Sequence, residues 1–271
     1  MKKNLLRVVA VLIACLSILF NLTGCGKAKD EGEANLKDEV VIGMDDTFVP
    51  MGFRDDKGNI VGFDVDLARE AFKRMNKKVK FQPIDWSMKE QELKNKNIDM
   101  IWNGYSINEK RKEQVAFTKA YLKNRQVIIT LSESKINSKE DLKNRVVAAQ
   151  AESSSLEAIN SEPELVNQFK NGEVVLFDTN NDALMDLEAG RTDAVVADEI
   201  MIRYYMESRG ENKYKILKDD FGDEEYGIGI RKEDKEFLKE LNNTLDDMKK
   251  DGAMGEISIK WFGENIINIE E

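Results

Sequence analysis

The sequence predicts an α/β fold of two similarly wound lobes that are joined by two chain crossings. Two observations carry this prediction. From Val40 onward, short β-rich runs alternate with amphipathic helical segments, and the same order of segments occurs twice. Such alternation is typical of helices layered on a mainly parallel sheet. About 234 residues follow the polar N-terminal segment, which is enough for two lobes of about 100 residues each.

In the first half, the pattern predicts strands over 40–44, 79–82 and 98–102, with Pro83 ending the second of them. A helix is expected from Asp64, as its N-cap, to Met75, because apolar residues recur there with helical spacing. A second, shorter helix is expected over 88–95.

In the second half, strands are expected over 146–149, 174–177 and 193–197, and helices over 154–160 and 181–189. The most similar pair of segments lies toward the ends of the two halves. The segments 93–99 and 187–193 share one spacing, from a leucine to an aspartate that opens an apolar strand. No short-period repeat is visible, so this similarity predicts two lobes and not a solenoid.

The two crossings are expected at 124–130 and at the return strand 226–230. The first lobe would then comprise residues 38–124 and 220–271, and the second lobe residues 125–219. The C-terminal segment, with Trp261 and Phe262, is expected to pack back on the first lobe. Two crossings between lobes form a hinge that can close.

The N-terminus predicts the compartment. Basic residues precede an apolar run, residues 8–20, that is short for a membrane span of about 20 residues. Residues 22–25, Leu-Thr-Gly-Cys, follow it and resemble a bacterial lipobox. Residues 1–24 are therefore interpreted as a lipoprotein signal peptide and Cys25 as the lipidated residue. The alternative is an uncleaved anchor with an incidental cysteine; both place the folded body outside the membrane.

Residues 25–37 are polar, charged and free of aromatic side chains, so they are expected to form a flexible tether. Residues 1–24 hold three basic residues and no acidic one, so their removal lowers the net charge from −10 to −13. A surface this acidic argues against nucleic acid or an anionic membrane surface as the ligand.

The chain has no histidine, and its only cysteines are Cys15, inside the apolar run, and Cys25. Ser-His-Asp and Cys-His catalysis are excluded on this ground, as are ordinary zinc sites. No metal, cofactor or disulfide is expected in the folded body.

Polar or small residues follow the expected strands: Asp45, residues 103–106, residues 150–155 and Asp198. Open α/β sheets bind ligands beyond the carboxyl ends of their strands. Two facing lobes would bring these four segments around one cleft.

Two charged residues have two interpretations each. Arg111 offers a planar fork that matches a carboxylate, although an arginine between Lys110 and Lys112 is also ordinary surface. Asp198 ends an apolar strand, where it could hold an ammonium group or cap the helix that starts at Glu199.

The serines of residues 153–155, at a strand-to-helix turn, suit an anion such as a carboxylate, and they equally suit an ordinary N-cap. Four aromatic residues are candidates either for the wall of a pocket or for the core: Phe48, Phe63, Trp86 and Tyr105.

Three segments in this order resemble the bacterial extracellular solute-binding proteins of family 3, which serve polar amino acids. Residues 62–68 resemble the family's signature, residues 103–112 its carboxylate-binding segment and residues 192–198 its ammonium-binding segment. The resemblance spans about residues 40–262. It implies the two-lobed periplasmic-binding-protein fold of type II and a role in delivering a free amino acid to an ABC transporter permease and its ATPase subunits.

By position, the resemblance implies a role for each site residue. Arg111 would bind the α-carboxylate of the ligand, helped by Ser106 and Ser154. Asp198 and the Gly104 carbonyl would hold the α-ammonium group. The remaining expected site residues are Asp45 and Gln150, which would set specificity, Phe48 and Phe63, which would sandwich the aliphatic part of the ligand, and Asn103 and Ser153.

One residue departs from the family's pattern. Glu152 stands where the family usually has glycine, and a positive φ there would strain it. An extracytoplasmic dehydratase-like enzyme on the same scaffold is the alternative function, and a sensory ectodomain is a third. An amino-acid-binding lipoprotein on the outer face of the cell membrane is the interpretation that the residues favour, and the sequence leaves open which amino acid it binds.

Overall fold

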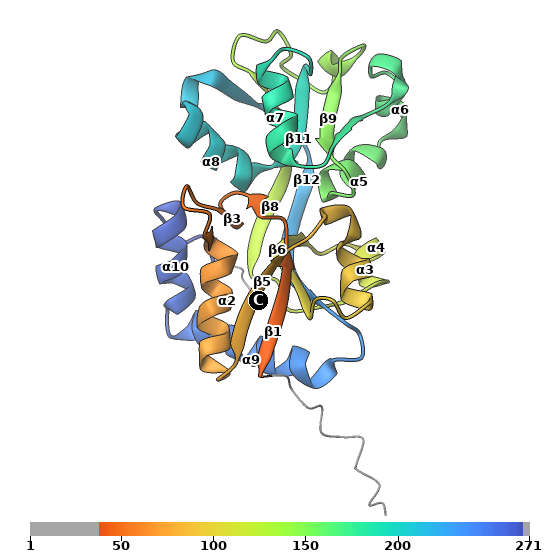
Figure 1. Ribbon diagram of the computed structural model, residues 1–271. Helices are drawn as coiled ribbons and strands as arrows, with labels where there is room; N and C mark the ends of the chain where they lie inside the picture. The colour runs from red at the N-terminus through yellow and green to blue at the C-terminus, as the bar shows by residue number, and fades with distance from the viewer. Residues whose placement is uncertain (1–37, 268–271) are drawn as a thin grey trace, which may run out of the picture. The chain divides into compact units, whose positions relative to one another are not determined.

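The computed structural model describes residues 38–267, in which strands and helices alternate in the expected order (Figure 1). The expected signal peptide, residues 1–24, the tether, residues 25–37, and Cys25 lie outside the described residues. Each helix within residues 38–267 is too short or too polar to span a membrane.

The first lobe is built from the N-terminal elements and the two last helices. Its strands and helices are β1 (Glu39–Met44), α2 (Phe63–Arg74), β5 (Lys78–Pro83), α3 (Lys89–Lys94), β6 (Met100–Ser106), α4 (Glu109–Lys112), β7 (Ala116–Phe117), α9 (Lys235–Lys250) and α10 (Ala253–Phe262). A small antiparallel sheet, β2 (Thr47–Phe48), β3 (Gly52–Arg54) and β4 (Ile60–Val61), connects β1 to α2.

The second lobe repeats this alternation. Its elements are β9 (Val147–Gln150), α5 (Ser154–Asn160), α6 (Pro163–Val166), β10 (Val175–Phe177), α7 (Asn180–Glu188), β11 (Ala194–Asp198) and α8 (Glu199–Arg209). Two long strands, β8 (Leu122–Leu131) and β12 (Tyr214–Ile230), lie between the two sets of elements (Figure 1).

The described strands form a nine-stranded mixed sheet in the order β10-β9-β11-β8-β12-β6-β1-β5, with β7 paired to β12. The strands of each lobe run parallel: β1 with β5 and β6, and β9 with β10 and β11. β8 and β12 pair antiparallel with each other, and each continues antiparallel beside a strand of one lobe, β11 or β6. These two strands are the chain crossings, and both are longer than the sequence pattern predicts.

Apolar side chains of α2, α9 and α10 form the core of the first lobe. The rings of Phe72 and Phe237 are 6.2 Å apart, and those of Phe63 and Phe262 are 5.0 Å apart. The expectation that the C-terminal segment packs on the first lobe is therefore confirmed. In the second lobe, Ile159 and Phe169 pack with the buried residues of β9 and β11.

Helix α2 begins two residues earlier than expected, and Asp64 is not its N-cap. The cap position is Gly62, whose φ of 146° and close approach to the Met51 carbonyl leave no room for a Cβ. Asp64 lies inside the first turn, where its carboxylate points into the protein and accepts a hydrogen bond from the Gly104 N–H. The expected N-cap is wrong because a tertiary hydrogen bond uses the carboxylate.

Candidate functional site

A small pocket lies where the carboxyl ends of the strands of both lobes meet. Its lining residues are Asp45, Phe48, Trp86, Asn103, Gly104, Arg111, Gln150, Ser153, Ser154 and Asp198. The cavity between them measures about 20 Å³, which is room for about one water molecule. The four strand-end segments that the sequence predicts around one cleft therefore do meet.

Arg111 forms one end of the pocket. Helix α4 positions it: the Asn108 side chain caps this helix and accepts a hydrogen bond from the Arg111 N–H at 2.8 Å. The guanidinium lies over the Tyr105 ring, 4.6 Å from its centroid, and its Nη1 donates to the Ser106 carbonyl at 3.1 Å. Arg111 is 3% exposed, so it is not a surface arginine.

The Arg111 guanidinium has hydrogen-bonding capacity to spare. Its Nε and Nη2 are buried and have no hydrogen-bond partner in the described protein. A buried N–H without an acceptor costs about 1–3 kcal/mol. These two nitrogens therefore favour an acceptor-rich planar group in the pocket, such as a carboxylate.

Ser106 and Ser154 lie beside this end of the pocket and connect the lobes. The Ser106 hydroxyl, at the end of β6, bonds the Ser154 hydroxyl of α5 at 2.9 Å. Ser106 itself lines the neighbouring hollow described below and not the pocket. Ser153 caps α5, because its Oγ accepts from the Leu156 N–H at 3.1 Å. The N-cap interpretation is thus confirmed for Ser153, which also lines the pocket.

Asn103 and Gly104, on β6, line the pocket from the first lobe. Gly104 has a φ of 57°, and a Cβ there would lie 2.6 Å from the Phe48 ring, so only glycine fits. Its N–H donates to Asp64 at 2.7 Å. Burial raises the pKa of the Asp64 carboxyl to about 7, although hydrogen bonds from Gly104 and Tyr121 oppose this shift. The Asn103 amide oxygen accepts from the Asp45 N–H at 3.0 Å.

Asp198 also lines the pocket and has three donors on one oxygen. Its Oδ1 accepts from Tyr226 at 2.5 Å, from Asn124 at 2.8 Å and from Gln126 at 3.0 Å. Asp198 precedes α8, but its side chain makes no capping hydrogen bond. The capping interpretation of Asp198 is therefore wrong, because side chains of the two crossing strands occupy the carboxylate.

Asp45 and Gln150 meet across the lobes in a third part of the pocket. Asp45 accepts from the Thr47 N–H at 2.9 Å and from the Gln150 amide, also at 2.9 Å. The Gln150 oxygen in turn accepts from the Asn180 amide at 2.9 Å. Burial raises the pKa of Asp45, and hydrogen bonds from Thr47 and Gln150 partly oppose this.

The structure does not bring Phe63 to the pocket. Its side chain is fully buried between Phe262 and Tyr121, in the core of the first lobe. The expected sandwich of Phe48 and Phe63 is corrected accordingly, because the chain turns at Gly62 and directs Phe63 inward. Trp86, which the sequence left between pocket and core, does line the pocket with Phe48.

Glu152 adopts the positive φ that its place in the turn suggests. Its φ is 52° and its side chain is exposed. The Glu152 carbonyl accepts a hydrogen bond at 2.9 Å from Lys89, a buried lysine of the first lobe. Burial lowers the pKa of this lysine, and the nearby charge of Glu90 opposes the shift. The strained turn thus takes part in the contact between the lobes.

Sequence reasoning missed several residues that hold the predicted ones in place. Glu224, on β12, accepts from the same Asn124 and Gln126 amides that serve Asp198. No local motif marks these residues, because their positions follow from the register between β8 and β12.

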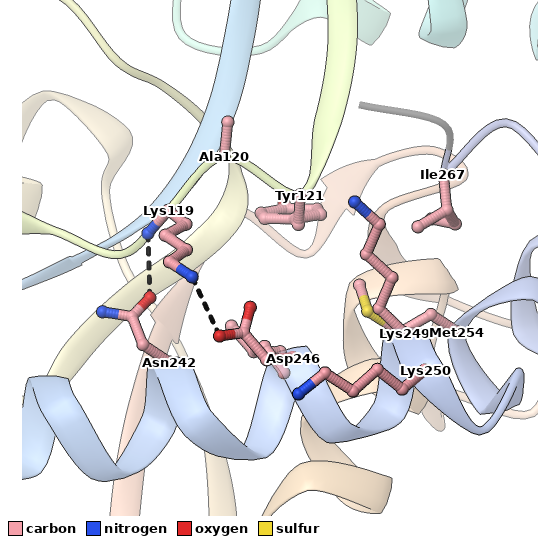
Figure 2. Close-up of a pocket in the computed structure, with 10 residues that line it drawn as sticks. Lys119, Ala120, Tyr121, Asn242, Asp246, Lys249, Lys250, Met254 and Ile267 are labelled. Atoms are coloured by element: carbon pink, nitrogen blue, oxygen red, sulfur yellow. Dashed lines mark hydrogen bonds and ion pairs between the residues drawn. The ribbon is translucent and has the colours of Figure 1, made fainter. Parts of the chain in front are cut away.

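Two larger hollows contain few of the predicted site residues. One of about 520 Å³ lies between α9, α10 and the segment 119–121 (Figure 2). There Lys119 is held by Asn242 and Asp246, at 2.9 Å each. The other, of about 590 Å³, borders the pocket through Ser154 and is also lined by Ser106 and Glu224. Predicted site residues therefore gather in the smallest of the three spaces.

Comparison with known proteins agrees with this geometry. A family model described as bacterial extracellular solute-binding proteins, family 3, matches residues 40–264. The Lysine/arginine/ornithine-binding periplasmic protein of Escherichia coli is 30% identical, with 94% of this chain and 97% of that protein covered. The ABC transporter glutamine-binding protein GlnH of Bacillus subtilis is also 30% identical, with 94% and 96% covered.

A solved structure is similar over most of the described chain. It is an ABC uptake transporter substrate-binding protein from Streptococcus pneumoniae with bound histidine, with 40% identity and a TM-score of 0.83, covering 86% of this chain and 95% of that one. All three proteins are named as binding proteins and none as an enzyme. The family match, which spans most of the chain, establishes that this protein belongs to the bacterial extracellular solute-binding proteins of family 3.

Proposed function

We propose that this protein captures a free polar amino acid in the pocket between its lobes and delivers it to the permease of an ABC importer. One observation carries the proposal. Arg111, buried in the pocket lining, has two nitrogens, Nε and Nη2, without an acceptor, and Asp198 supplies a carboxylate to the same lining. A cationic fork and a carboxylate in one pocket are complementary to the α-carboxylate and α-ammonium groups that an amino acid carries on one carbon.

Different residues bind different groups of the ligand. Arg111 binds the α-carboxylate, with the Ser154 hydroxyl of the second lobe and Ser106 beside it. Asp198 and the Gly104 carbonyl hold the α-ammonium group. Phe48 packs against the aliphatic part; Phe63 has no part in the site, since its ring lies in the core.

Asp45 and Gln150 set specificity. The Asp45 carboxylate favours a ligand side chain that donates hydrogen bonds, and it repels a ligand carboxylate. Glutamine, arginine, lysine, histidine or cystine is therefore expected to bind better than glutamate or aspartate.

Entry of the ligand requires the lobes to move apart. The cavity of about 20 Å³ is far smaller than an amino acid. Residues 38–124 with 220–271 form one moving lobe and residues 125–219 the other, and they rotate about β8 and β12. Opening breaks contacts such as Ser106–Ser154 and Lys89–Glu152. The closed form is the one that the permease recognises.

The protein works at the extracytoplasmic face of the cell membrane. Residues 1–24 are the signal peptide, Cys25 carries the lipid, and residues 25–37 are the tether that lets the folded body reach the permease. The lipobox sequence and the polar character of the tether support this placement. A permease and its ATPase subunits are the expected partners, and the protein has no catalytic activity of its own.

A thermal-unfolding screen of the purified protein against the common amino acids and cystine tests the proposal. A ligand at about 1,000 times its Kd stabilises the folded state by about 4 kcal/mol. For a chain of this size, that raises the Tm by about 10 °C.

The expected result is a large rise with one or a few polar amino acids, larger for amides, cations or cystine than for glutamate or aspartate. Arg111→Ala should reduce the rise by at least about half. If no amino acid raises the Tm at millimolar concentration, the proposed function is wrong. If glutamate or aspartate ranks first, only the role given to Asp45 is wrong.

A further inference from the structure

Asp198 does not stand alone at its end of the pocket, because a second carboxylate shares its hydrogen-bond donors. The Asn124 amide donates to Asp198 at 2.8 Å and to Glu224 at 2.6 Å. The Gln126 amide likewise donates to Asp198 at 3.0 Å and to Glu224 at 2.8 Å. One oxygen of each carboxylate therefore lies within hydrogen-bond distance of the same two nitrogens.

The orientation of both amides is fixed from their far side. The Asn124 oxygen accepts from the Ile200 N–H at 3.3 Å, and the Gln126 oxygen accepts from the Ser155 hydroxyl at 2.5 Å. Their NH₂ groups must therefore point at the carboxylates. The Gln126 NH₂ has two hydrogens but faces three acceptors, since the Ser154 hydroxyl also lies 3.2 Å away. The Gln126 NH₂ can therefore satisfy only two of these three acceptors at a time.

Electrostatics in this place oppose two negative charges. Asp198 is 5% exposed. Its pKa is raised well above the usual range, first by burial and then by the neighbouring charge of Glu224, while hydrogen bonds from Tyr226 and Gln126 oppose the shift. Glu224 is only half-buried, but two neighbouring carboxylates of which one is buried commonly retain one proton between them.

The other charged groups near the pair either form ion pairs or hydrogen bonds of their own or belong to the lining of the pocket. Arg125, the neighbour of both amides on β8, is bound to Glu199 and Asp220. Arg111 and Asp45 line the same pocket. Asp64 is linked to Tyr121, whose ring lies 6.4 Å from that of Tyr226.

We propose that Glu224 is a further residue of the ligand site, forming with Asp198 a carboxylate pair that holds one proton until the ligand's ammonium group replaces it. The proton leaves to solvent, so binding a zwitterion converts a protonated pair into two carboxylates that face one ammonium. This inference rests on the proposed function, since it needs a ligand with an ammonium group in this pocket. Glu224 does not line the pocket but lines the hollow of about 590 Å³ that borders it through Ser154, and this hollow offers the proton a route to solvent.

The pair also ties the ammonium group to both crossings. Asn124 and Gln126 belong to β8, whereas Glu224 and Tyr226 belong to β12. Asp198, at the end of β11, is thus held by both strands about which the lobes move. A group that enters between these side chains acts directly on the crossings.

The first test needs no ligand and follows the Tm of the protein between pH 5 and pH 8. A carboxyl whose pKa is raised by folding binds its proton more tightly in the folded state. Its stabilising effect is present at low pH and is lost as the pH rises through the folded-state pKa. Glu224→Gln removes the neighbouring charge and lowers the pKa of Asp198, so less stability is lost. The Tm of this variant relative to wild type should rise by about 2–4 °C across the range.

Two further variants make the test specific. Glu225→Gln removes the same charge from the next, exposed residue of β12, and its Tm should run parallel to that of wild type. Tyr226→Phe removes a donor that stabilises the ionised form of Asp198, so its Tm relative to wild type should fall as the pH rises. Asp64, with a pKa of about 7, contributes to every variant alike and cancels in the differences.

The second test measures proton release on binding. Titration calorimetry with L-glutamine, L-arginine and L-cystine is run in two buffers of different ionisation enthalpy, again from pH 5 to pH 8. Wild type and Glu225→Gln should release up to one proton per bound amino acid. Over part of this pH range, Glu224→Gln should release at most about half as many protons as wild type.

The outcomes separate the two proposals. A Glu224→Gln profile that runs parallel to wild type and Glu225→Gln in the ligand-free test overturns the carboxylate pair, whatever binds. If that profile changes as expected but no amino acid binds, the proposed function fails and the protonated pair stands as a feature of the fold. If an amino acid binds and the variants release equal numbers of protons, the replacement of the proton by the ammonium group is wrong.

Discussion

The surroundings of Arg111 and those of Asp198, the Arg111 end and the Asp198 end of the site, are prepared for a ligand in opposite ways. At the Arg111 end, two nitrogens of a buried guanidinium have no acceptor among the described residues. At the Asp198 end, a single carboxylate oxygen already accepts three hydrogen bonds, from Tyr226, Asn124 and Gln126. Arg111 thus lacks hydrogen-bond partners for two of its nitrogens, whereas Asp198 already has three donors on one oxygen.

The number of hydrogen bonds already made around each residue determines how much binding energy a ligand gains there. A ligand carboxylate adds hydrogen bonds at Arg111 without displacing any that the protein makes, and it removes the cost of unpaired buried donors. A ligand ammonium group at Asp198 enters an existing network, so part of its interaction energy replaces bonds that are already there. We therefore expect the Arg111 end to dominate affinity and the Asp198 end to contribute recognition of the α-amino group.

The largest expected effect follows from Arg111→Ala. Loss of the fork leaves the ligand carboxylate buried and unpaired, which costs about 2–5 kcal/mol. Affinity for the best amino acid of the screen should fall by about 30-fold to several thousand-fold. Calorimetry measures this loss. Thermal unfolding without ligand should show little destabilisation, because the lost side chain was itself only partly satisfied.

Two companion variants sharpen this prediction. Arg111→Lys keeps the charge but not the planar fork, so it should restore only part of the affinity. Lys112→Ala removes a charge from the next residue of α4, which is exposed, and should leave binding unchanged. Equal affinity of Arg111→Ala and wild type would place the carboxylate elsewhere and remove the basis of the comparison between the two ends.

A smaller effect is expected from Asp198→Asn. Asparagine keeps the size of the side chain and an acceptor for its neighbours, but it loses the charge that faces the ammonium group. The loss of a charge-assisted hydrogen bond, reduced by the network that is already present, should be about 1–2 kcal/mol, or about 5- to 30-fold in affinity. The measurement is calorimetry with the same amino acid and with its analogue that lacks the α-amino group.

The analogue is the control that isolates the ammonium group. Its affinity is expected to be weak and nearly equal for wild type and Asp198→Asn. If the variant weakens both ligands by the same factor, Asp198 supports the fold of the pocket and does not contact the ligand. If Asp198→Asn costs more than Arg111→Ala, the proposed order of the two ends is reversed.

Sequence reasoning identified four residues of the pocket for the same physical reason. Asp45, Gln150 and Asp198 each end or follow a buried strand, and Arg111 comes shortly after another. Because the carboxyl ends of parallel strands meet at one edge, residues that follow strands in both halves can be assigned to one cleft before their distances are known. The alternation of elements predicted the fold by an equally local pattern.

The residues that sequence reasoning missed are placed by long-range register. Gln126 and Glu224 lie within the two long crossing strands, and they meet only because β8 and β12 pair antiparallel. Neither has a motif of its own. Phe63 was misplaced for a related reason: the backbone at Gly62 turns this ring toward Phe262, a residue from the opposite end of the chain.

The smallest expected effect concerns the turn of the second lobe, which meets the first lobe through Lys89. Glu152 has a φ of 52°, a conformation that costs a residue with a Cβ about 1 kcal/mol or more relative to glycine. Its side chain is exposed, so no packing is lost on truncation. Glu152→Gly should therefore stabilise the folded protein by about 0.5–1 kcal/mol, because the relief of strain exceeds the added freedom of the unfolded chain. Chemical denaturation without ligand measures this change.

Two controls separate strain from charge in this prediction. Glu152→Gln removes the same charge near Lys89 but keeps the strained backbone, so it should not reproduce the gain. Glu173→Gly makes the same substitution at an exposed residue with a φ of −144°, where glycine only adds freedom to the unfolded chain. It should destabilise by about 0.5–1 kcal/mol, opposite in sign to Glu152→Gly. The Lys89 contact uses the carbonyl of residue 152, which glycine retains, so amino-acid affinity should change by less than about threefold. A Glu152→Gly protein no more stable than Glu152→Gln would mean that the turn stores no strain. The contact between this turn and Lys89 would then carry no conformational cost.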